Sequence, residues 1–314
     1  MWKGISLVAV LVVAAPARAA DIDKLLPNDC ECVLTLNVGQ LLESDLNKKH
    51  GLVKMQDLLD SSEEIREILK SLAFDPLKDI HRITWASSNT GDSGKALIII
   101  HGRFEPKRFH TKADEVEQNH GEILKIHPVG QSRLYEIDFP GQGPYFVAIV
   151  DACTIVVSAG REYVVEALNK AAGIKKSEVK KELADLVRKV QADRTLWLVA
   201  LKSALEHSPL SADDAARPVL AKIETVYLGV IVSQELKAEF DLTTKNPQTA
   251  KELNKDLLEK LDRGKGIVSI LVGNVKELQI LLDLAEAMKV TYQGSTVSLR
   301  GHIGADAIAK SLKE

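Results

Sequence analysis

Residues 236–244 read LKAEFDLTT, and apolar and polar side chains alternate from Leu236 to Thr243. Side chains two positions apart lie on the same face of a strand. One face therefore carries Leu236, Ala238, Phe240 and Leu242, and the other carries Lys237, Glu239 and Asp241. The pattern predicts an antiparallel strand with one face on a core and the other in water. A second stretch, ALIII at 96–100, is apolar throughout and predicts a central strand covered on both faces.

These two strands begin at Ala96 and Leu236. Three further pairs of matching positions repeat at nearly the same separation along the chain: Arg82 and Thr225, Pro106 and Pro247, and Thr154 and Thr296. Separations that agree to within a few positions indicate an internal duplication, and the period is too long for a solenoid repeat.

Each copy opens with the order strand–helix–strand–strand–helix, which is the split order of a ferredoxin-like unit. We therefore expect an α+β fold of two related units, each a mainly antiparallel sheet covered by helices. The expected divisions are a signal peptide at 1–19, a first unit at 20–174, a linker helix at 175–192 and a second unit at 193–314.

Hydrophobic periodicity places the individual elements. Strands are expected at 32–38, 82–88, 96–100, 123–126, 133–139, 144–150, 154–158, 195–201, 226–232, 236–244 and 296–302. Helices are expected at 56–73, 106–119, 162–172, 175–191, 212–223, 248–263, 274–288 and 306–312. If the two units match, Leu97 and Ile99, or Ile98 and Ile100, should be as buried as the apolar face of 236–244.

The beginning of the chain has the pattern of an export signal. Lys3 precedes the apolar run ISLVAVLVVAA at 5–15, and Ala17-Arg18-Ala19 offers small residues at the positions that a signal peptidase reads. The run is too short for a membrane-spanning helix, which needs roughly 20 residues. We expect cleavage after Ala19 or Ala20, and a periplasmic or secreted protein without a transmembrane span after processing.

The composition excludes several classes of protein. The chain has 314 residues, of which 45% are hydrophobic and 27% charged. This profile is typical of a globular protein and not of a disordered chain, a collagen or a multi-span membrane protein. The 41 basic and 44 acidic residues give a net charge of −3, so no basic excess points to a nucleic-acid partner. Aromatic residues make up only 4%, which argues against a surface that stacks sugars or bases.

The three cysteines, Cys30, Cys32 and Cys153, leave the thiol chemistry open. An exported protein meets oxidising conditions, and a disulfide from Cys153 to one of the others requires that their strands be neighbours. Cys30 and Cys32, two positions apart in an expected strand, should point to the same face. The alternative is three thiols that pack as small hydrophobic side chains. The usual zinc spacing with histidine partners is absent from the sequence.

Gly91-Asp92-Ser93-Gly94 spells the signature around the nucleophile of chymotrypsin-like proteases. It lies between two expected strands and has the ordinary composition of a turn, so we interpret it as a turn. The eight histidines are scattered without an H-E-x-x-H pair, and the sequence has no phosphate-binding loop and no G-x-S-x-G elbow. The sequence therefore assigns no catalytic, cofactor-binding or metal-binding residue.

Close to the start of the expected mature chain stand Leu26-Pro27-Asn28-Asp29, followed by VLTLNV at 33–38 and by Leu41-Leu42. This opening resembles that of a group of uncharacterised exported bacterial proteins, which start with a Leu-Pro-x-Asp turn, a strand and a helix. Those proteins carry repeated α+β units and have no assigned activity. The resemblance is confined to the short stretch 26–42. It implies an extracytoplasmic bacterial protein and supplies no catalytic residues.

Three hypotheses about function follow. The first is an exported, non-enzymatic protein that binds an unknown ligand, a protein or another component of the cell envelope, and two similar units could present two faces to it. The second is a hydrolase with a site between the two units, for which His101, Asp92 and Ser93 are the candidate residues. The third is a periplasmic carrier of an apolar ligand, which needs a large dry cavity between sheet and helices.

Overall fold

The computed structural model describes residues 20–50, 63–139, 141, 143–214, 216–272, 283–284 and 286–311. The strands are β1 (Cys32–Leu36), β2 (Ile80–Ser87), β3 (Ala96–Gly102), β4 (Leu124–Val129), β5 (Ser132–Phe139), β6 (Gly143–Asp151), β7 (Thr154–Ser158), β8 (Leu196–Leu201), β9 (Ile223–Val232), β10 (Leu236–Thr244), β11 (Lys289–Gln293) and β12 (Thr296–Ile303). The α-helices are α1 (Val38–Glu43), α2 (Asp45–His50), α4 (Glu63–Ser71), α5 (Pro76–Asp79), α6 (Pro106–Asn119), α7 (Arg161–Ala171), α8 (Lys181–Lys189), α9 (Lys202–Glu206), α10 (Arg217–Leu220), α11 (Pro247–Val272) and α13 (Ala305–Ser311). Two 3-10 turns, η1 (Ser93–Lys95) and η2 (Pro209–Ala212), complete the described elements.

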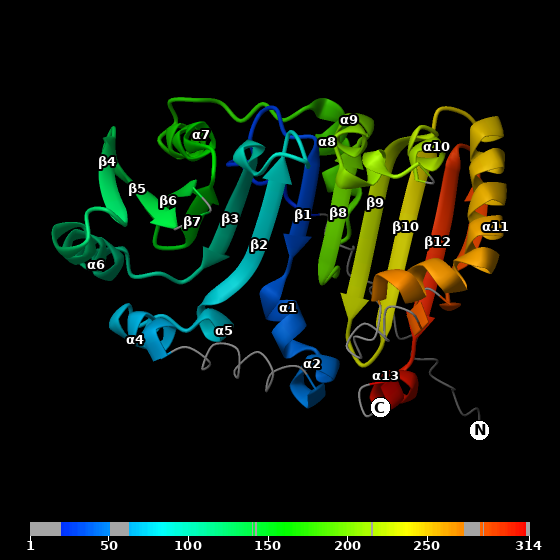
Figure 1. Ribbon diagram of the computed structural model, residues 1–314, viewed down its shortest axis with the longest axis horizontal. Helices are drawn as coiled ribbons and strands as arrows, with labels where there is room; N and C mark the ends of the chain where they lie inside the picture. Colours follow the sequence, from blue (N-terminus) through cyan, green and yellow to red (C-terminus); the bar gives the residue numbers. More distant parts are fainter. Residues whose placement is uncertain are drawn as a thin grey trace, which may run out of the picture.

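The described strands form one 12-stranded sheet in the order β11-β12-β10-β9-β8-β1-β2-β3-β7-β6-β5-β4 (Figure 1). All neighbouring strands run antiparallel. The fold is therefore α+β with a large antiparallel sheet, as the alternation in 236–244 predicts. A ferredoxin-like unit pairs its first and third strands in parallel, and this order is not found among the described strands.

β1 and β8 lie side by side at the middle of the sheet. We call β1–β7 the N-terminal half and β8–β12 the C-terminal half. Outward from the middle the strands follow the orders β1-β2-β3-β7-β6 and β8-β9-β10-β12-β11. The third strand of each half leads into a helix whose first residue is a proline, Pro106 in α6 and Pro247 in α11. Proline suits a first helical position because its missing N–H has no intrahelical partner there.

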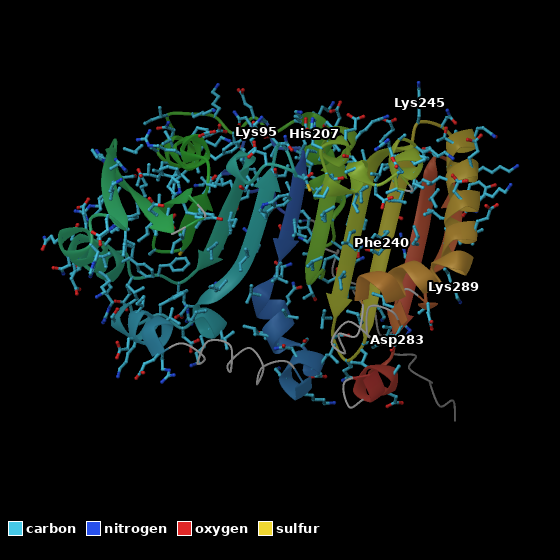
Figure 2. All side chains as sticks on the ribbon, in the orientation of Figure 1. Lys95, His207, Phe240, Lys245, Asp283 and Lys289 are labelled. Carbon is cyan, nitrogen blue, oxygen red and sulfur yellow. The ribbon has the colours of Figure 1, made fainter. Side chains whose placement is uncertain are left out.

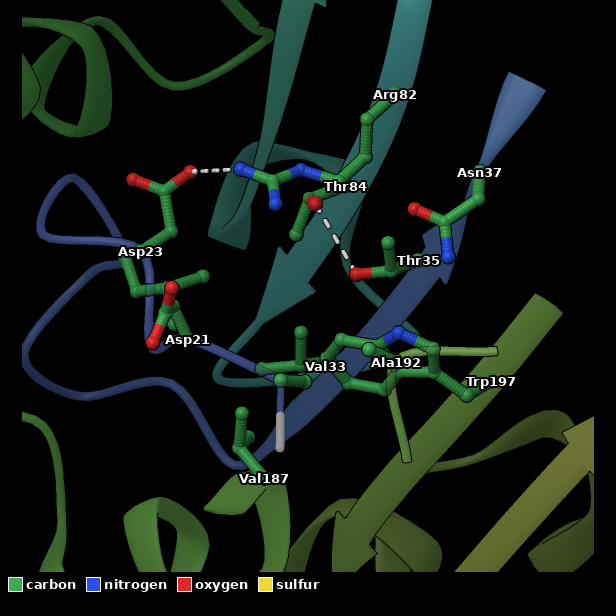
Figure 3. A pocket seen from close by; sticks show the side chains of 12 residues that line it. Asp21, Asp23, Val33, Thr35, Asn37, Arg82, Thr84, Val187, Ala192 and Trp197 are labelled. Carbon is green, nitrogen blue, oxygen red and sulfur yellow. Dashed lines mark hydrogen bonds and ion pairs between the residues drawn. The ribbon is translucent and has the colours of Figure 1, made fainter. Parts of the chain in front are cut away.

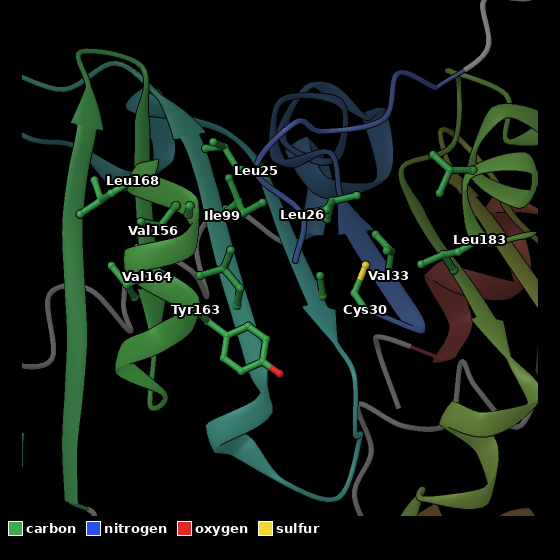
Figure 4. Close-up of a cluster of buried hydrophobic side chains, with 14 of the residues drawn as sticks. Leu25, Leu26, Cys30, Val33, Ile99, Val156, Tyr163, Val164, Leu168 and Leu183 are labelled. Atoms are coloured by element: carbon green, nitrogen blue, oxygen red, sulfur yellow. The ribbon is translucent and has the colours of Figure 1, made fainter. Parts of the chain in front are cut away.

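Helices pack on both faces of the sheet. α7 covers one face of the N-terminal half, which we call the α7 face, and α6 and α11 pack against the opposite face, which we call the α11 face. The largest core lies on the α7 face beneath α7, α8 and the segment 20–30 (Figure 4). There Leu97 and Ile99 of β3 are completely buried together with Val164 of α7. The smaller cores on the α11 face include Leu253 of α11.

β10 has the two faces that its sequence predicts. Ala238 and Leu242 are buried on the α11 face, at 5% and 8% exposure, whereas Lys237 on the other face is exposed. Leu236 and Phe240 are only half-buried, as are Ile98 and Ile100 on the same face of β3. The burial of these two residues therefore matches that of Ile98 and Ile100, whereas the alternative match to the completely buried Leu97 and Ile99 is wrong for them. Phe240, about midway along β10 (Figure 2), belongs to the same hydrophobic cluster as Met288 and Ile308.

Most strand predictions agree with the structure to within a few residues, but several elements do not. The short helices α1, α2, α5 and α9 are not predicted. The helix expected at 212–223 is wrong: among the described residues of this stretch only Arg217–Leu220 is α-helical, preceded by the 3-10 turn Pro209–Ala212. Pro209 and Pro218 each remove an amide donor, which prevents a long helix. β11 is not predicted at all. Most of the helix expected at 274–288, and 56–62 of the first expected helix, lie outside the described residues.

The linker expected at 175–191 contains a shorter helix, α8 (Lys181–Lys189). Its apolar side chains Leu183 and Val187 are buried at 0% and 1% exposure in the main core. The segment is thus packed against the middle of the sheet and is not a free connection.

The three cysteines are free thiols. Cys153 is exposed in the turn between β6 and β7, and Cys32 lies in β1. β2 and β3 separate β1 from β7, which places a strand-to-strand distance of about 14 Å between them, too far for a disulfide. The expectation that Cys30 and Cys32 share a face is wrong, because Cys30 packs in the core of the α7 face and Cys32 beside Ala200 on the α11 face. Cys30 precedes the strand, so the two-residue period does not apply to it.

No helix within the described residues is long and apolar enough to cross a bilayer. The expected signal peptide at 1–19 lies outside the described residues.

Candidate functional site

The α7 face changes character from one half of the sheet to the other. The strand registers join the following residues in one row across this face: Ile99, Thr84, Thr35, Trp197, Gly229, Glu239 and Arg300. Ile99, at the end of the row in the N-terminal half of the sheet, is completely buried. Arg300, at the end of the row in the C-terminal half, is exposed. The row therefore passes from hydrophobic core to charged surface.

Polar side chains interact on the C-terminal part of this face, five of them around the carboxylates of Glu239 and Asp241. Arg194, which precedes β8 and is 8% exposed, donates from Nε to Glu239 Oε1 at 2.7 Å and to Tyr227 Oη at 3.1 Å. Tyr227 Oη donates to the same Glu239 oxygen at 2.6 Å. Arg300 donates to both carboxylate oxygens of Asp241, at 2.8 and 3.1 Å, and its Nε lies 3.5 Å from Glu239 Oε2. We call these five residues the charged cluster.

Gly229 makes room for the charged cluster. A Cβ at this position would lie 2.3 Å from Tyr227 Oη and 2.8 Å from Glu239 Oε1, so only glycine allows both groups to meet above β9. Burial raises the pKa of Tyr227 to about 12, and the carboxylate of Glu239 adds to the shift. The phenol therefore keeps its proton and serves as a hydrogen-bond donor, since an activated nucleophile would need a lowered pKa.

Two hollows flank the charged cluster, with volumes of about 660 and 350 Å³. Arg194, Glu239 and Arg300 line both of them. The larger hollow is completed by basic groups, including Lys237 and Lys289, and the smaller one by side chains such as Lys189, Thr225 and Thr243. Hollows of this size fall in the range that binds small molecules or peptide segments.

A third hollow of about 580 Å³ adjoins the larger one at Ile231, which lines both. Its wall contains four carboxylates, Glu43, Asp45, Asp193 and Glu235. We call the three hollows together the polar trough. A basic part and an acidic part therefore lie next to each other along the trough.

A separate, smaller cavity lies on the α7 face where the two halves meet. It has a volume of about 170 Å³ and is bounded by the segment 20–26, by β1, β2 and β8, and by Val187 of α8. Figure 3 shows Asp21 and Asp23 on one side of it, the Trp197 indole on the opposite side, and the Arg82 guanidinium extending toward Asp23. We call it the junction cavity.

Asp23 fixes the N-terminal segment to the sheet beside this cavity. Its side chain is 9% exposed, and Oδ2 lies 2.5 Å from His101 Nε2 and 3.6 Å from Arg82 Nη2. The amide of Leu25 donates to Oδ1 at 3.0 Å. Burial by itself would raise the pKa of Asp23, but the hydrogen bonds from His101 and Leu25 outweigh it, and the pKa is lowered. Asp23 is therefore an ionised anchor.

The structure does not bring together the residues considered for a hydrolase. His101 stands near the end of β3, next to the junction cavity, whereas Asp92 and Ser93 lie in the turn before β3, at its opposite end. Asp92 Oδ1 accepts a hydrogen bond from the Gly94 amide at 2.9 Å and caps η1. The interpretation of 91–94 as a turn is confirmed.

The sequence assigns no residue to either site. The sequence pattern predicts only that one face of the strand at 236–244, which carries Lys237, Glu239 and Asp241, is exposed to solvent. The missing information is the pairing of distant strands, which sets Arg300 opposite Glu239 and Gly229 beside it. The alternation of Ser298, Arg300 and His302 in β12 is a signal that could have found Arg300.

Comparisons with known proteins add little. No protein-family model matches the chain, and no curated protein matches it. A similar solved structure is crystal form I of TP0453, which is 11% identical, with a TM-score of 0.47 over 94% of this chain and 98% of that one. A similarity this distant supports no family and no function.

Proposed function

We propose that this chain is an exported, non-enzymatic binding protein of the bacterial cell envelope, built of two related units, and that its polar trough holds a segment of a protein partner. The observation that carries the proposal is the charged cluster. Arg194 is nearly buried, yet it is held by Glu239 and Tyr227 in the wall of two open hollows. A fixed array of donors and acceptors of this kind lowers the entropic cost of binding a polar ligand.

The proposal of two related units is supported by the matching strand orders on either side of the β1–β8 pair. It is supported also by α6 and α11, which follow the third strand of each half and begin at the matching prolines, Pro106 and Pro247. The proposal of export depends on the sequence of residues 1–20 and on the resemblance of residues 26–42 to exported bacterial proteins.

The charges of the trough favour a polypeptide as its ligand. Lys237 and Lys289 stand in one part of the trough, and Glu43 and Asp45 in the adjoining part. A polypeptide can present side chains of both signs at such spacings, whereas nucleic acids and anionic polymers present one sign only. The scarcity of aromatic side chains, 4% of the chain, gives a glycan few rings to stack on.

The two alternative functions have less support. A carrier of apolar ligands needs a dry cavity, and all four hollows described above have charged side chains in their walls. Of the three candidate residues for a hydrolase at the junction of the halves, His101 is the only one that lies near the junction.

Site-specific photo-crosslinking tests the proposed function. A photoreactive amino acid is placed at Lys237 or Lys289 in the trough, and at Lys255 on the exposed side of α11 as a matched control, where the lysine is 78% exposed. Irradiation of cells of the source organism should give one protein adduct from both trough positions and none from the control. Mass spectrometry then identifies the partner.

The purified partner should bind the unmodified protein and bind the double variant Lys237→Glu, Lys289→Glu at least about tenfold more weakly. The proposal fails if the adducts from the trough and from Lys255 are the same, or if the double variant binds as tightly as the original chain.

A further inference from the structure

The junction cavity has its own chemistry, separate from that of the polar trough. Its walls carry two carboxylates, Asp21 and Asp23, and one guanidinium, Arg82. Across from the carboxylates, Trp197 is 6% exposed and forms a flat wall. An engineered apolar cavity of about 150 Å³ admits benzene, with six heavy atoms. The junction cavity, at about 170 Å³, therefore has room for a molecule of similar size.

Arg82 is the side chain in this wall that has a hydrogen-bond donor without a partner among the described residues. Its Nε atom is buried and has no hydrogen-bond partner among the described residues, and its Nη2 atom is 3.6 Å from Asp23 Oδ2, which is longer than a hydrogen bond. The two hydroxyls below it, Thr35 Oγ1 and Thr84 Oγ1, bond to each other at 3.0 Å. A buried N–H donor without a partner favours a molecule that brings an acceptor.

The two carboxylates restrict what that molecule can be. A simple anion would satisfy Arg82 but would lie close to Asp21 and Asp23, whose charges repel it. A simple cation would be attracted by the carboxylates but would leave the Arg82 donor unmet. A molecule that carries an anionic group and a cationic group on the same carbon atom satisfies both sides of the cavity.

We propose that the junction cavity is a binding site for a small zwitterion of the α-amino acid type, such as glycine or alanine. The carboxylate accepts from Arg82, the ammonium group donates toward Asp21 and Asp23, and the small side chain faces Trp197 and Val33. Each carboxylate oxygen can accept more than one hydrogen bond, so Asp23 can take the ammonium group while it keeps His101. This site is independent of the trough and of its proposed protein partner.

The fluorescence of Trp197 can report binding in the junction cavity. The chain has three tryptophans, Trp2, Trp85 and Trp197, so the full-length variant Trp2→Phe, Trp85→Phe leaves Trp197 as the sole indole reporter. Its fluorescence is followed during titration with glycine, L-alanine, acetate or methylammonium. Glycine and alanine should give a saturable change, and acetate and methylammonium should bind about tenfold or more weakly, as expected for loss of a charged hydrogen bond.

Two substitutions in the reporter variant locate the site. Arg82→Met should weaken glycine binding about tenfold or more, whereas Arg103→Met, at a 67% exposed arginine paired with Asp79, should leave it unchanged. If Arg82→Met does not fold, Asp21→Asn at the opposite wall gives the same test, with weaker glycine binding and improved acetate binding expected.

Three results would overturn the proposal: no saturable response to any of the four probes, acetate binding as tight as glycine binding, or unchanged glycine binding in the cavity variants. None of these results bears on the trough, because the photo-crosslinking experiment does not involve the junction cavity.

Discussion

Val156 in β7 and Ser298 in β12 occupy matching places in the two strand orders, and both lie on the α7 face. Val156 is completely buried in the core under α7. Ser298 is half-buried and donates to Asp241 at 2.6 Å. The same face of one sheet thus serves as a core in the N-terminal half and as a polar surface in the C-terminal half.

The difference begins at the helix that follows each of these strands. α7 turns back over the α7 face and buries Tyr163 and Val164 there. α13 packs Ile308 with Ala238 and Ile303, on the α11 face near the end of β12 (Figure 1). Because α7 covers only the N-terminal half, the strands of the C-terminal half carry Glu239 and Asp241 where the N-terminal half carries Ile99 and His101. The position of this one helix therefore decides whether the α7 face of each half is covered or exposed.

Truncation of matched β3 and β10 side chains should give the largest contrast between the halves. Leu97, completely buried, and Lys237, exposed, are the second residues of these two strands and both lie on the α7 face. Leu97→Ala should lower the free energy of unfolding by about 2–5 kcal/mol, because it leaves a cavity in the core. Lys237→Ala should change it by less than about 0.5 kcal/mol. Chemical denaturation monitored by circular dichroism measures both, and equal losses would contradict the comparison.

The contrast between β3 and β10 also shows which features of the fold a sequence pattern can predict. The period of two in 236–244 predicts which side chains of β10 face the core and which face solvent, and the apolar run at 96–100 predicts a covered strand. Both are local properties. The junction cavity combines residues 20–26, Thr35, Arg82, Val187 and Trp197, which only the folded topology brings together. β11, with its exposed Lys289 and Tyr292, has too few buried positions to show a pattern.

The glycines that precede α7 and α13 test why the two helices pack differently. A Cβ on Gly160 would lie 2.0 Å from the carbonyl oxygen of Gly94, so α7 can start against the β2–β3 turn only if this residue is glycine. Gly304, immediately before α13, has no atom within 4 Å of such a Cβ. Gly160→Ala should destabilise the protein by about 1–3 kcal/mol, as overpacking does, whereas Gly304→Ala should have little effect.

Thermal or chemical unfolding of the two glycine variants measures this difference. In a hydrogen-exchange experiment, the backbone amides of α7 should exchange faster in Gly160→Ala than in the original chain, because the start of the helix must move away from Gly94. If the two variants are equally stable and α7 exchanges as in the original chain, the close approach at Gly160 does not hold α7 on its face.

The smallest expected effect concerns two tyrosines, Tyr163 in α7 and Tyr227 in the charged cluster. Burial is the largest cause that raises the pKa of each to about 12, and nearby carboxylates add to it, Asp29 for Tyr163 and Glu239 for Tyr227. In the unfolded chain a tyrosine ionises near pH 10. Between about pH 10 and 12 the unfolded chain therefore loses a proton that the folded protein keeps, so each tyrosine contributes stability that is present below pH 10 and is lost as pH rises through this range.

Ultraviolet absorbance of the phenolate, taken as the difference between the original chain and Tyr227→Phe, isolates the ionisation of Tyr227. Glu239→Gln should lower the pKa of Tyr227, because it removes the negative charge that opposes ionisation, and it should leave the pKa of Tyr163 unchanged, because that residue interacts with Asp29 and Ser88 in the other half. An ordinary pKa near 10 for Tyr227 would mean that its phenol is not held in the charged cluster. An equal shift of both tyrosines in Glu239→Gln would mean that the two halves share one electrostatic environment, and the contrast between a core face and a polar face would then not hold.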